Sequence, residues 1–270
     1  MNLIEQKVNA PIGLFDSGIG GVSIWRELVR LLPHESTIYV ADSANCPYGF
    51  RPTAEIRALS AEIVTFLIAQ GCKLIVVACN TASAAALYWL REQFNIPFVG
   101  LEPALKPAAK ASKTGHIGIL ATQGTLQGEL LHNTIRTHAQ TVQVHVRVGS
   151  GLAKQVENGQ LDTPMTKKLL SEHLEVLLAK KVDQIALGCT HYPLLQPLID
   201  QILAGRAVAI DPAPAVIRQV QRLLNVDNIQ ALSATPLHQF YSTGTTEQLQ
   251  RMVNRFSARP ITVQPLRLKG

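Results

Sequence analysis

Two segments of the chain place a cysteine between a short apolar run and a helix-like continuation. They read LIVVACNTAS (74–83) and QIALGCTHYP (184–193), with the cysteines at Cys79 and Cys189. Each cysteine stands where a predicted strand ends and a predicted helix begins, and the N-terminus of a helix favours a thiolate. Two thiols in equivalent places indicate paired acid and base chemistry.

A second pair of segments repeats in the same order. IGLFDSG (12–18) resembles IGILATQG (117–124), and each is an apolar run that ends in a hydroxyl residue and a glycine. In both halves this turn precedes the cysteine segment by a similar stretch of chain. A duplicated α/β domain explains this order. Ligands of such domains lie beyond the carboxyl ends of the strands, so two facing halves would bring both cysteines to one cleft.

Short apolar runs alternate along the chain with amphipathic stretches, which predicts a mostly parallel α/β fold with two pseudo-symmetric domains. Strands are expected at 12–16, 37–41, 74–78, 97–101, 116–121, 142–148, 184–188, 207–210, 238–242 and 261–264. Helices are expected at 23–32, 53–69, 82–94, 125–138, 164–180, 194–203 and 214–224. The first domain is expected to comprise 11–102 plus 207–270, and the second 103–206.

Composition excludes several classes of protein. The chain has 270 residues, of which 47% are hydrophobic and 16% charged, so a large core is expected. The net charge of +6 comes from scattered lysines and arginines rather than the stripe of a nucleic-acid-binding protein. There is no apolar run of membrane-spanning length and no leader-like segment, so we expect a cytoplasmic protein without membrane contact. The four cysteines form no close pair typical of a metal site, and Cys72 is expected to be a buried structural thiol.

Two loops after predicted strands contain further candidate residues. The glycine-rich turn that starts at Asp16 either caps a helix or brings backbone N–H groups to an anionic ligand. It matches neither the dinucleotide fingerprint nor the P-loop. The Pro-Tyr-Gly sequence at 47–49 is either a plain turn or a place where Tyr48 and Gly49 offer donors to a carboxylate.

The two cysteines also have other interpretations. A free cysteine is often only a small buried hydrophobic residue, and His191 can be a surface or capping histidine or a group that exchanges protons with Cys189. A metal site would use Cys79, Cys189, His191 and Asp16, but these lack the tight spacing of metal ligands. A Cys-His hydrolase needs one nucleophilic cysteine and leaves the second unexplained.

Five segments together resemble the glutamate racemase family, in that family's order and spacing, over residues 12 to about 212. They are FDSGIGG (15–21), DSA with PYG (42–44 and 47–49), ACNTAS (78–83), ILATQGT (119–125) and GCTHYPLL (188–195). The last is the most specific. Aspartate racemases of the same superfamily typically have Thr-Glu after the second cysteine, whereas this chain has Thr190-His191, which favours glutamate.

The resemblance implies a racemase that uses two bases and neither a cofactor nor a metal, with glutamate bound between the domains. It implies that Cys79 acts on D-glutamate and Cys189 on L-glutamate. It further implies that three residues assist the thiols and that others hold the amino and carboxylate groups of the substrate. The assisting residues are Asp16, His191 and Glu157; the substrate-binding positions are Asp16, Ser17, Tyr48, Gly49, Asn80, Thr81, Thr190 and His191.

The family pattern also suggests a homodimer and a role in supplying D-glutamate for peptidoglycan. The chain departs from the pattern at Asn45-Cys46 and at Ser150-Gly151. Two other interpretations stay open: a racemase for aspartate or another amino acid, and a binding protein that keeps the cleft without catalysis.

Overall fold

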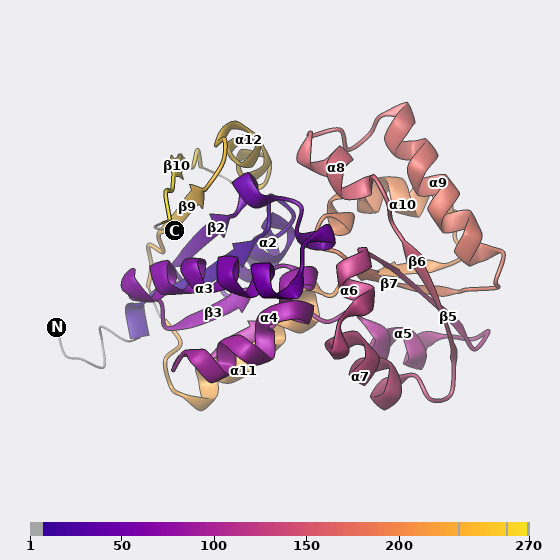
Figure 1. Cartoon of the computed structure of the whole chain (residues 1–270), viewed down its shortest axis with the longest axis horizontal. Helices are drawn as coiled ribbons and strands as arrows, with labels where there is room; N and C mark the ends of the chain where they lie inside the picture. The colour runs from indigo at the N-terminus through magenta and orange to yellow at the C-terminus, as the bar shows by residue number, and fades with distance from the viewer. Residues whose placement is uncertain (1–7, 232, 258, 269–270) are drawn as a thin grey trace.

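The computed structural model describes residues 8–231, 233–257 and 259–268. Two lobes lie side by side, each built on a sheet with helices on both faces (Figure 1). The first sheet has the strand order β10-β9-β2-β1-β3-β4 and the second β6-β5-β7-β8. Every pair of neighbouring strands is parallel. The predicted α/β fold class is therefore confirmed.

All of the predicted strands are present, close to their expected bounds. The strands are β1 (Ile12–Asp16), β2 (Thr37–Ala41), β3 (Leu74–Val77), β4 (Phe98–Gly100), β5 (His116–Ala121), β6 (Gln143–Val148), β7 (Gln184–Gly188), β8 (Val208–Ile210), β9 (His238–Ser242) and β10 (Val263–Pro265). Most were recognisable because parallel strands are buried on both faces and read as continuous apolar runs.

The helices alternate with these strands. They are α2 (Val22–Leu31), η1 (Ser43–Asn45), η2 (Tyr48–Phe50), α3 (Thr53–Ala69), α4 (Asn80–Gln93), α5 (Leu105–Ala111), α6 (Gln123–Gln127), α7 (Glu129–His138), α8 (Leu152–Glu157), α9 (Pro164–Leu178), η3 (Tyr192–Leu195), α10 (Gln196–Leu203), α11 (Ala213–Val226) and α12 (Glu247–Phe256). In the part of the chain that the structure describes, no helix has the length and apolar character needed to cross a membrane.

Four strands of the first sheet have the same order as the four strands of the second. β1 lies between β2 and β3, as β5 lies between β6 and β7, and β4 and β8 follow as the next strands outward. The register agrees as well: Phe15 pairs with Val77, two residues before Cys79, and Leu120 pairs with Leu187, two residues before Cys189. This agreement places Asp16 and Ala121 at equivalent positions, directly beside the segments that carry Cys79 and Cys189.

Alternate side chains of β1 point into two separate hydrophobic cores. Leu14 is fully buried in a core that contains Leu28 of α2 and Ile217 of α11. Phe15 is fully buried on the other face, in a core with Leu67 of α3 and Leu90 of α4. Burial of each such side chain contributes about 1.5–3 kcal/mol. The sheet is therefore clamped from both faces, which fixes the ends of its strands in space.

The predicted boundary at residue 207 needs correction, because β8 pairs with β7 in the second sheet. The chain returns to the first lobe after Ile210, where α11 packs against α2 and β4. Of the range 207–270 that we assigned to the first domain, 232, 258 and 269–270 lie outside the described residues.

The helix expected at 125–138 is also different, because it is split into α6 and α7. Gly128 between them has an extended backbone (φ −76°, ψ 141°), and a Cβ there would lie 2.5 Å from the Cβ of Ala84. The close packing on α4 thus explains both the glycine and the break. Three α-helices, α5, α8 and α12, were not anticipated.

Candidate active site

Both cysteines of the repeated segments line one cavity of about 480 Å³. Cys79 is the N-cap residue of α4, and its Sγ accepts a hydrogen bond of 3.4 Å from the backbone N–H of Ala82. The thiol of Cys79 also lies 3.7 Å from the hydroxyl oxygen of Ser17, at the end of β1. Cys189 directly follows β7 and precedes η3. The duplicated topology therefore brings two thiols from different lobes to the same cavity.

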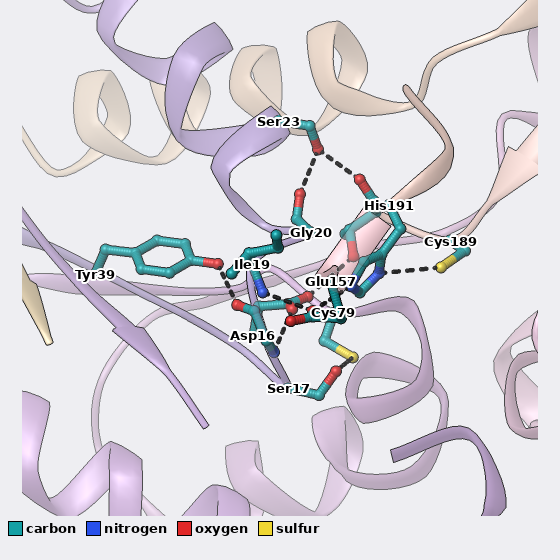
Figure 2. A network of polar contacts seen from close by, with 12 residues as sticks. Asp16, Ser17, Ile19, Gly20, Ser23, Tyr39, Cys79, Glu157, Cys189 and His191 are labelled. Carbon is teal, nitrogen blue, oxygen red and sulfur yellow. Dashed lines mark hydrogen bonds and ion pairs between the residues drawn. The ribbon is translucent and has the colours of Figure 1, made fainter. Parts of the chain in front are cut away.

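Cys189 is the first member of a chain of three side chains, here called the Cys189 triad (Cys189, His191 and Glu157). The Sγ atom of Cys189 lies 3.5 Å from Nδ1 of His191, and Nε2 of His191 lies 2.6 Å from Oε1 of Glu157 (Figure 2). Burial alone would lower the pKa of His191, but Cys189 and Glu157 together raise it well above its usual range. Burial would raise the pKa of Glu157, yet the contact with His191 leaves it below its ordinary value. The pair is therefore held as an imidazolium and a carboxylate.

Asp16 lies behind the wall of the cavity rather than on it. The side chain is completely buried, and its two carboxylate oxygens accept hydrogen bonds from the N–H of Gly18 (2.7 Å) and the hydroxyl of Thr190 (3.0 Å). Burial raises the pKa of Asp16 to about 6, despite the nearby charge of His191. Asp16 is thus placed to influence the thiols through its charge, and it does not face the cavity as the predicted substrate-binding residue would.

The thiol of Cys79 is less acidic than its position at a helix N-terminus predicts. Burial, with the negative charge of Asp16 added, raises its pKa to about 12. The hydrogen bonds from Ala82 and Ser17 act in the opposite direction without offsetting this effect. The helix N-terminus is present as expected, but desolvation is the larger contribution here.

All of the other candidate substrate-binding residues line the cavity. They are Ser17, Tyr48, Gly49, Asn80, Thr81, Thr190 and His191. The side-chain amide of Asn80 is buried and has no hydrogen-bond partner among the described residues. A buried amide of this kind is costly unless a ligand satisfies it. Tyr48 differs from expectation, because its hydroxyl already donates a 2.5 Å hydrogen bond to Asp42.

Several cavity-lining residues were not among the candidates, and they include Thr122, Lys154 and Cys46. Thr122 contacts Thr81 through a hydroxyl–hydroxyl hydrogen bond of 2.9 Å. In the sequence repeat, Thr122 occupies the position that Ser17 has in the first half. Lys154 lines the cavity from α8, one turn before Glu157 on the same helix. Cys46 also lines it and had drawn notice only as a departure from the family pattern. The repeat was therefore a usable signal for Thr122 alone.

The residues that an alternative metal site would use are not assembled as ligands in the described part of the chain. Across residues 8–231, 233–257 and 259–268, no three or more histidine, cysteine, aspartate or glutamate side chains are grouped so that they could hold a metal ion. Cys72 is buried and free, and it lies against Gly13 of β1. It is therefore the structural thiol that the sequence indicated.

Comparison with known proteins places these features in a family. The family model for Asp/Glu/hydantoin racemases matches residues 12–220. A glutamate racemase of Roseiflexus sp. (strain RS-1) is 46% identical over 250 residues, which cover 91% of each chain. The chain belongs to the glutamate racemase family. It is accordingly an isomerase of the racemase type, and the resemblance noted in the sequence is confirmed.

Solved structures of this family share the fold along the whole chain. The Escherichia coli glutamate racemase in complex with L-glutamate and an activator, UDP-MurNAc-Ala, has a TM-score of 0.85 and 32% identity, covering 97% of this chain and all of that one. The Francisella tularensis glutamate racemase in complex with D-glutamate has a TM-score of 0.84 and 28% identity, covering 96% and 98%. The two-lobed arrangement is thus the fold of glutamate racemases.

Proposed function

We propose that the protein interconverts L-glutamate and D-glutamate by a two-base mechanism in which Cys79 acts on the D-enantiomer and Cys189 on the L-enantiomer, without a cofactor. The observation that carries this proposal is the position of the two free thiols. They follow equivalent strands of two equivalent lobes and line the same cavity. Pseudo-symmetry of this kind suits a reaction that needs one group on each face of an α-carbon.

In this mechanism one thiolate removes the α-proton while the opposite thiol donates a proton to the other face. The carbon–hydrogen bond breaks on one side and forms on the other, and the two sulfur atoms exchange roles in the reverse reaction. Acid and base must therefore have separately tuned environments. The structure offers two: Cys189 lies beside His191, which contacts Glu157 through its other nitrogen, whereas Cys79 has Ser17, the start of α4 and the charge of Asp16.

Formation of the Cys79 thiolate needs help, given its raised pKa. The α-ammonium group of an amino acid in the cavity supplies a positive charge, which favours the ionised thiol. Asp16 adds a negative charge behind Ser17 that favours the protonated thiol. We propose that this balance lets Cys79 serve as acid and as base, with Asp16 and His191 as the assisting groups and Glu157 orienting His191.

The cavity also offers partners for the two carboxylates of glutamate. The unpartnered amide of Asn80, the hydroxyls of Thr81 and Thr190 and the N-terminus of α4 are suitable donors. Glutamate as the substrate is supported by the related structures that hold its enantiomers. We further propose that the enzyme works in the cytoplasm as a homodimer and supplies D-glutamate for peptidoglycan.

Exchange of solvent deuterium into glutamate tests the reaction directly. Incubation of either enantiomer in D₂O should incorporate deuterium at the α-carbon and produce the other enantiomer. The variants Cys79→Ser and Cys189→Ser should each racemise glutamate about 10²–10⁴-fold more slowly, which is the range expected for loss of a general acid or base. Cys72→Ser serves as the matched control and should retain the rate, because Cys72 lies outside the cavity.

Other outcomes separate the alternatives. Full turnover in either cysteine variant would contradict the two-base scheme. Saturable binding of glutamate without any exchange would identify a binding protein, and faster exchange with aspartate would identify a different racemase.

A further inference from the structure

Glu157 belongs to the second lobe but is held by residues of the first. The backbone N–H of Ile19, in the turn after β1, donates a 2.9 Å hydrogen bond to Oε1 of Glu157 (Figure 2). Gly18 precedes it in the same turn, and a Cβ on Gly18 would overlap the Glu157 carboxylate. The turn and the carboxylate are thus in direct contact across the boundary between the lobes.

Cys46 comes to the same place from another loop of the first lobe. It ends η1, in the connection between β2 and α3, and it lines the catalytic cavity. Its Sγ would lie 3.0 Å from a Cβ on Gly18, the same point that the Glu157 carboxylate overlaps. The thiol and the carboxylate therefore pack against one glycine, with no room for a side chain between them.

We propose that Cys46 is a positioning residue, whose thiol donates a hydrogen bond to the Glu157 carboxylate and holds it against His191. Cys46 itself does not exchange protons with the substrate. It acts through the Cys189 triad, because Glu157 orients the imidazole that contacts Cys189. The first lobe thus supplies two donors, Ile19 and Cys46, that complete the acid–base group of the second lobe.

The charges around Glu157 agree with a neutral thiol at residue 46. Burial, together with the charges of Glu157 and Asp16, raises the pKa of Cys46 far above its ordinary value, so the thiol keeps its proton and can donate it. The hydrogen bond from Cys46 also helps to lower the pKa of Glu157. The other titratable or charged groups near the carboxylate are His191, Asp16, Tyr39 and, on its own helix, Lys154.

Replacement of the thiol by a methyl group or by a hydroxyl group separates hydrogen bonding from packing. Cys46→Ala should lower kcat/KM for glutamate by about three- to tenfold, as expected for a carboxylate that loses one hydrogen bond. Cys46→Ser keeps a donor at nearly the same place and should restore kcat/KM to within about twofold of the parent. Cys72→Ala, at a buried cysteine outside the cavity, is the control and should leave kcat/KM unchanged.

Two further measurements do not depend on glutamate turnover. The pH dependence of Cys189 alkylation by iodoacetamide, followed by peptide mass mapping, should shift to higher pH in Cys46→Ala and return in Cys46→Ser. The infrared S–H stretching band of Cys46, identified by its loss in Cys46→Ser, should lie at lower frequency than that of Cys72, because hydrogen bonding weakens the S–H bond. This second measurement reads the band of the unaltered protein, uses Cys46→Ser only to assign that band, and needs no folded alanine variant.

The proposal rests on the proposed racemase function only for the kinetic measurement. A protein that shows the alkylation and infrared shifts but no racemisation would support the role of Cys46 and contradict the proposed function. A Cys46→Ser variant as impaired as Cys46→Ala, an unshifted Cys189 alkylation profile, or an S–H band at the frequency of Cys72 would each overturn the role of Cys46.

Discussion

The hydroxyl group of Thr190, in the second lobe, donates a 3.0 Å hydrogen bond to the carboxylate of Asp16, in the first. The backbone of Thr190 is tied to the first lobe as well, since its carbonyl oxygen accepts a 3.0 Å hydrogen bond from Ser23 of α2. Thr190 directly follows Cys189, and Asp16 ends the strand beside Cys79. The surroundings of each thiol are thus hydrogen-bonded to the opposite lobe, so the contacts between the lobes help to position the groups around both thiols.

Replacement of Asp16 by asparagine should make the thiol of Cys79 more acidic. The negative charge of Asp16 helps to raise the pKa of Cys79 to about 12. Its removal should lower the pH midpoint of Cys79 alkylation by about one pH unit, the order expected for the loss of one nearby charge. Peptide mass mapping after iodoacetamide treatment measures this midpoint for Cys79 alone. An unchanged midpoint would show that Asp16 does not act on Cys79 through its charge.

Thr190→Val should raise the pKa of Asp16 further above about 6, because the ionised carboxylate loses a donor. The lost hydrogen bond lowers the unfolding free energy mainly when Asp16 is ionised, because it stabilises the carboxylate form. The variant should therefore lose about 1–3 kcal/mol of unfolding free energy at pH 8 and less at pH 5. Carbon-13 NMR titration of the Asp16 carboxyl and urea unfolding at both pH values test this. Thr190→Ser keeps the donor and should behave as the parent; an equal loss at both pH values would contradict the assignment.

Gly18→Ala should impair catalysis through Glu157. The added methyl group overlaps the carboxylate and must displace it from His191. Displacement by about 1 Å can cost about 10²-fold in rate. Steady-state racemisation by Gly18→Ala, Glu157→Gln and the double variant forms a cycle, in which the double variant should be no slower than the slower single variant. Additive losses would mean that Gly18 acts on another part of the site.

Lys73→Met should destabilise the fold without a specific effect on the site. The Lys73 ammonium lies 2.7 Å from the carboxylate of Glu35, and both side chains are buried. It also donates to the carbonyl oxygens of Val8 (2.6 Å) and Ile229 (2.7 Å), which ties three segments together. Removal leaves the buried Glu35 without its counter-charge, at a cost of about 3–5 kcal/mol.

The unfolding free energy from urea titration measures this cost. Lys168→Met is the control and should change it by less than about 0.5 kcal/mol, because Lys168 and Glu172 form an exposed pair at 4.0 Å. A similar loss in both variants would mean that burial of the Lys73–Glu35 pair is not decisive.

Part of the site was readable from single segments of the sequence. The apolar run 74–77 forms β3, and Cys79 caps the helix that follows, as the pattern indicated. In contrast, β8 has only three residues, and no local feature of its sequence predicts which sheet it joins. Its pairing with β7 depends on where the chain crosses between the lobes, and the boundary at 207 was wrong for that reason.

The sequence by itself determined the parallel α/β class, the duplicated order and the placing of both cysteines at strand ends. These features depend on residues near one another along the chain, through apolar runs and helix caps. Only the tertiary structure decided that Ile19 donates to Glu157 with Cys46 packed beside it, that Thr190 donates to Asp16, and that burial raises the pKa of Cys79. Contacts across the lobes and the loss of solvent depend on groups far apart in sequence, and no local pattern encodes them.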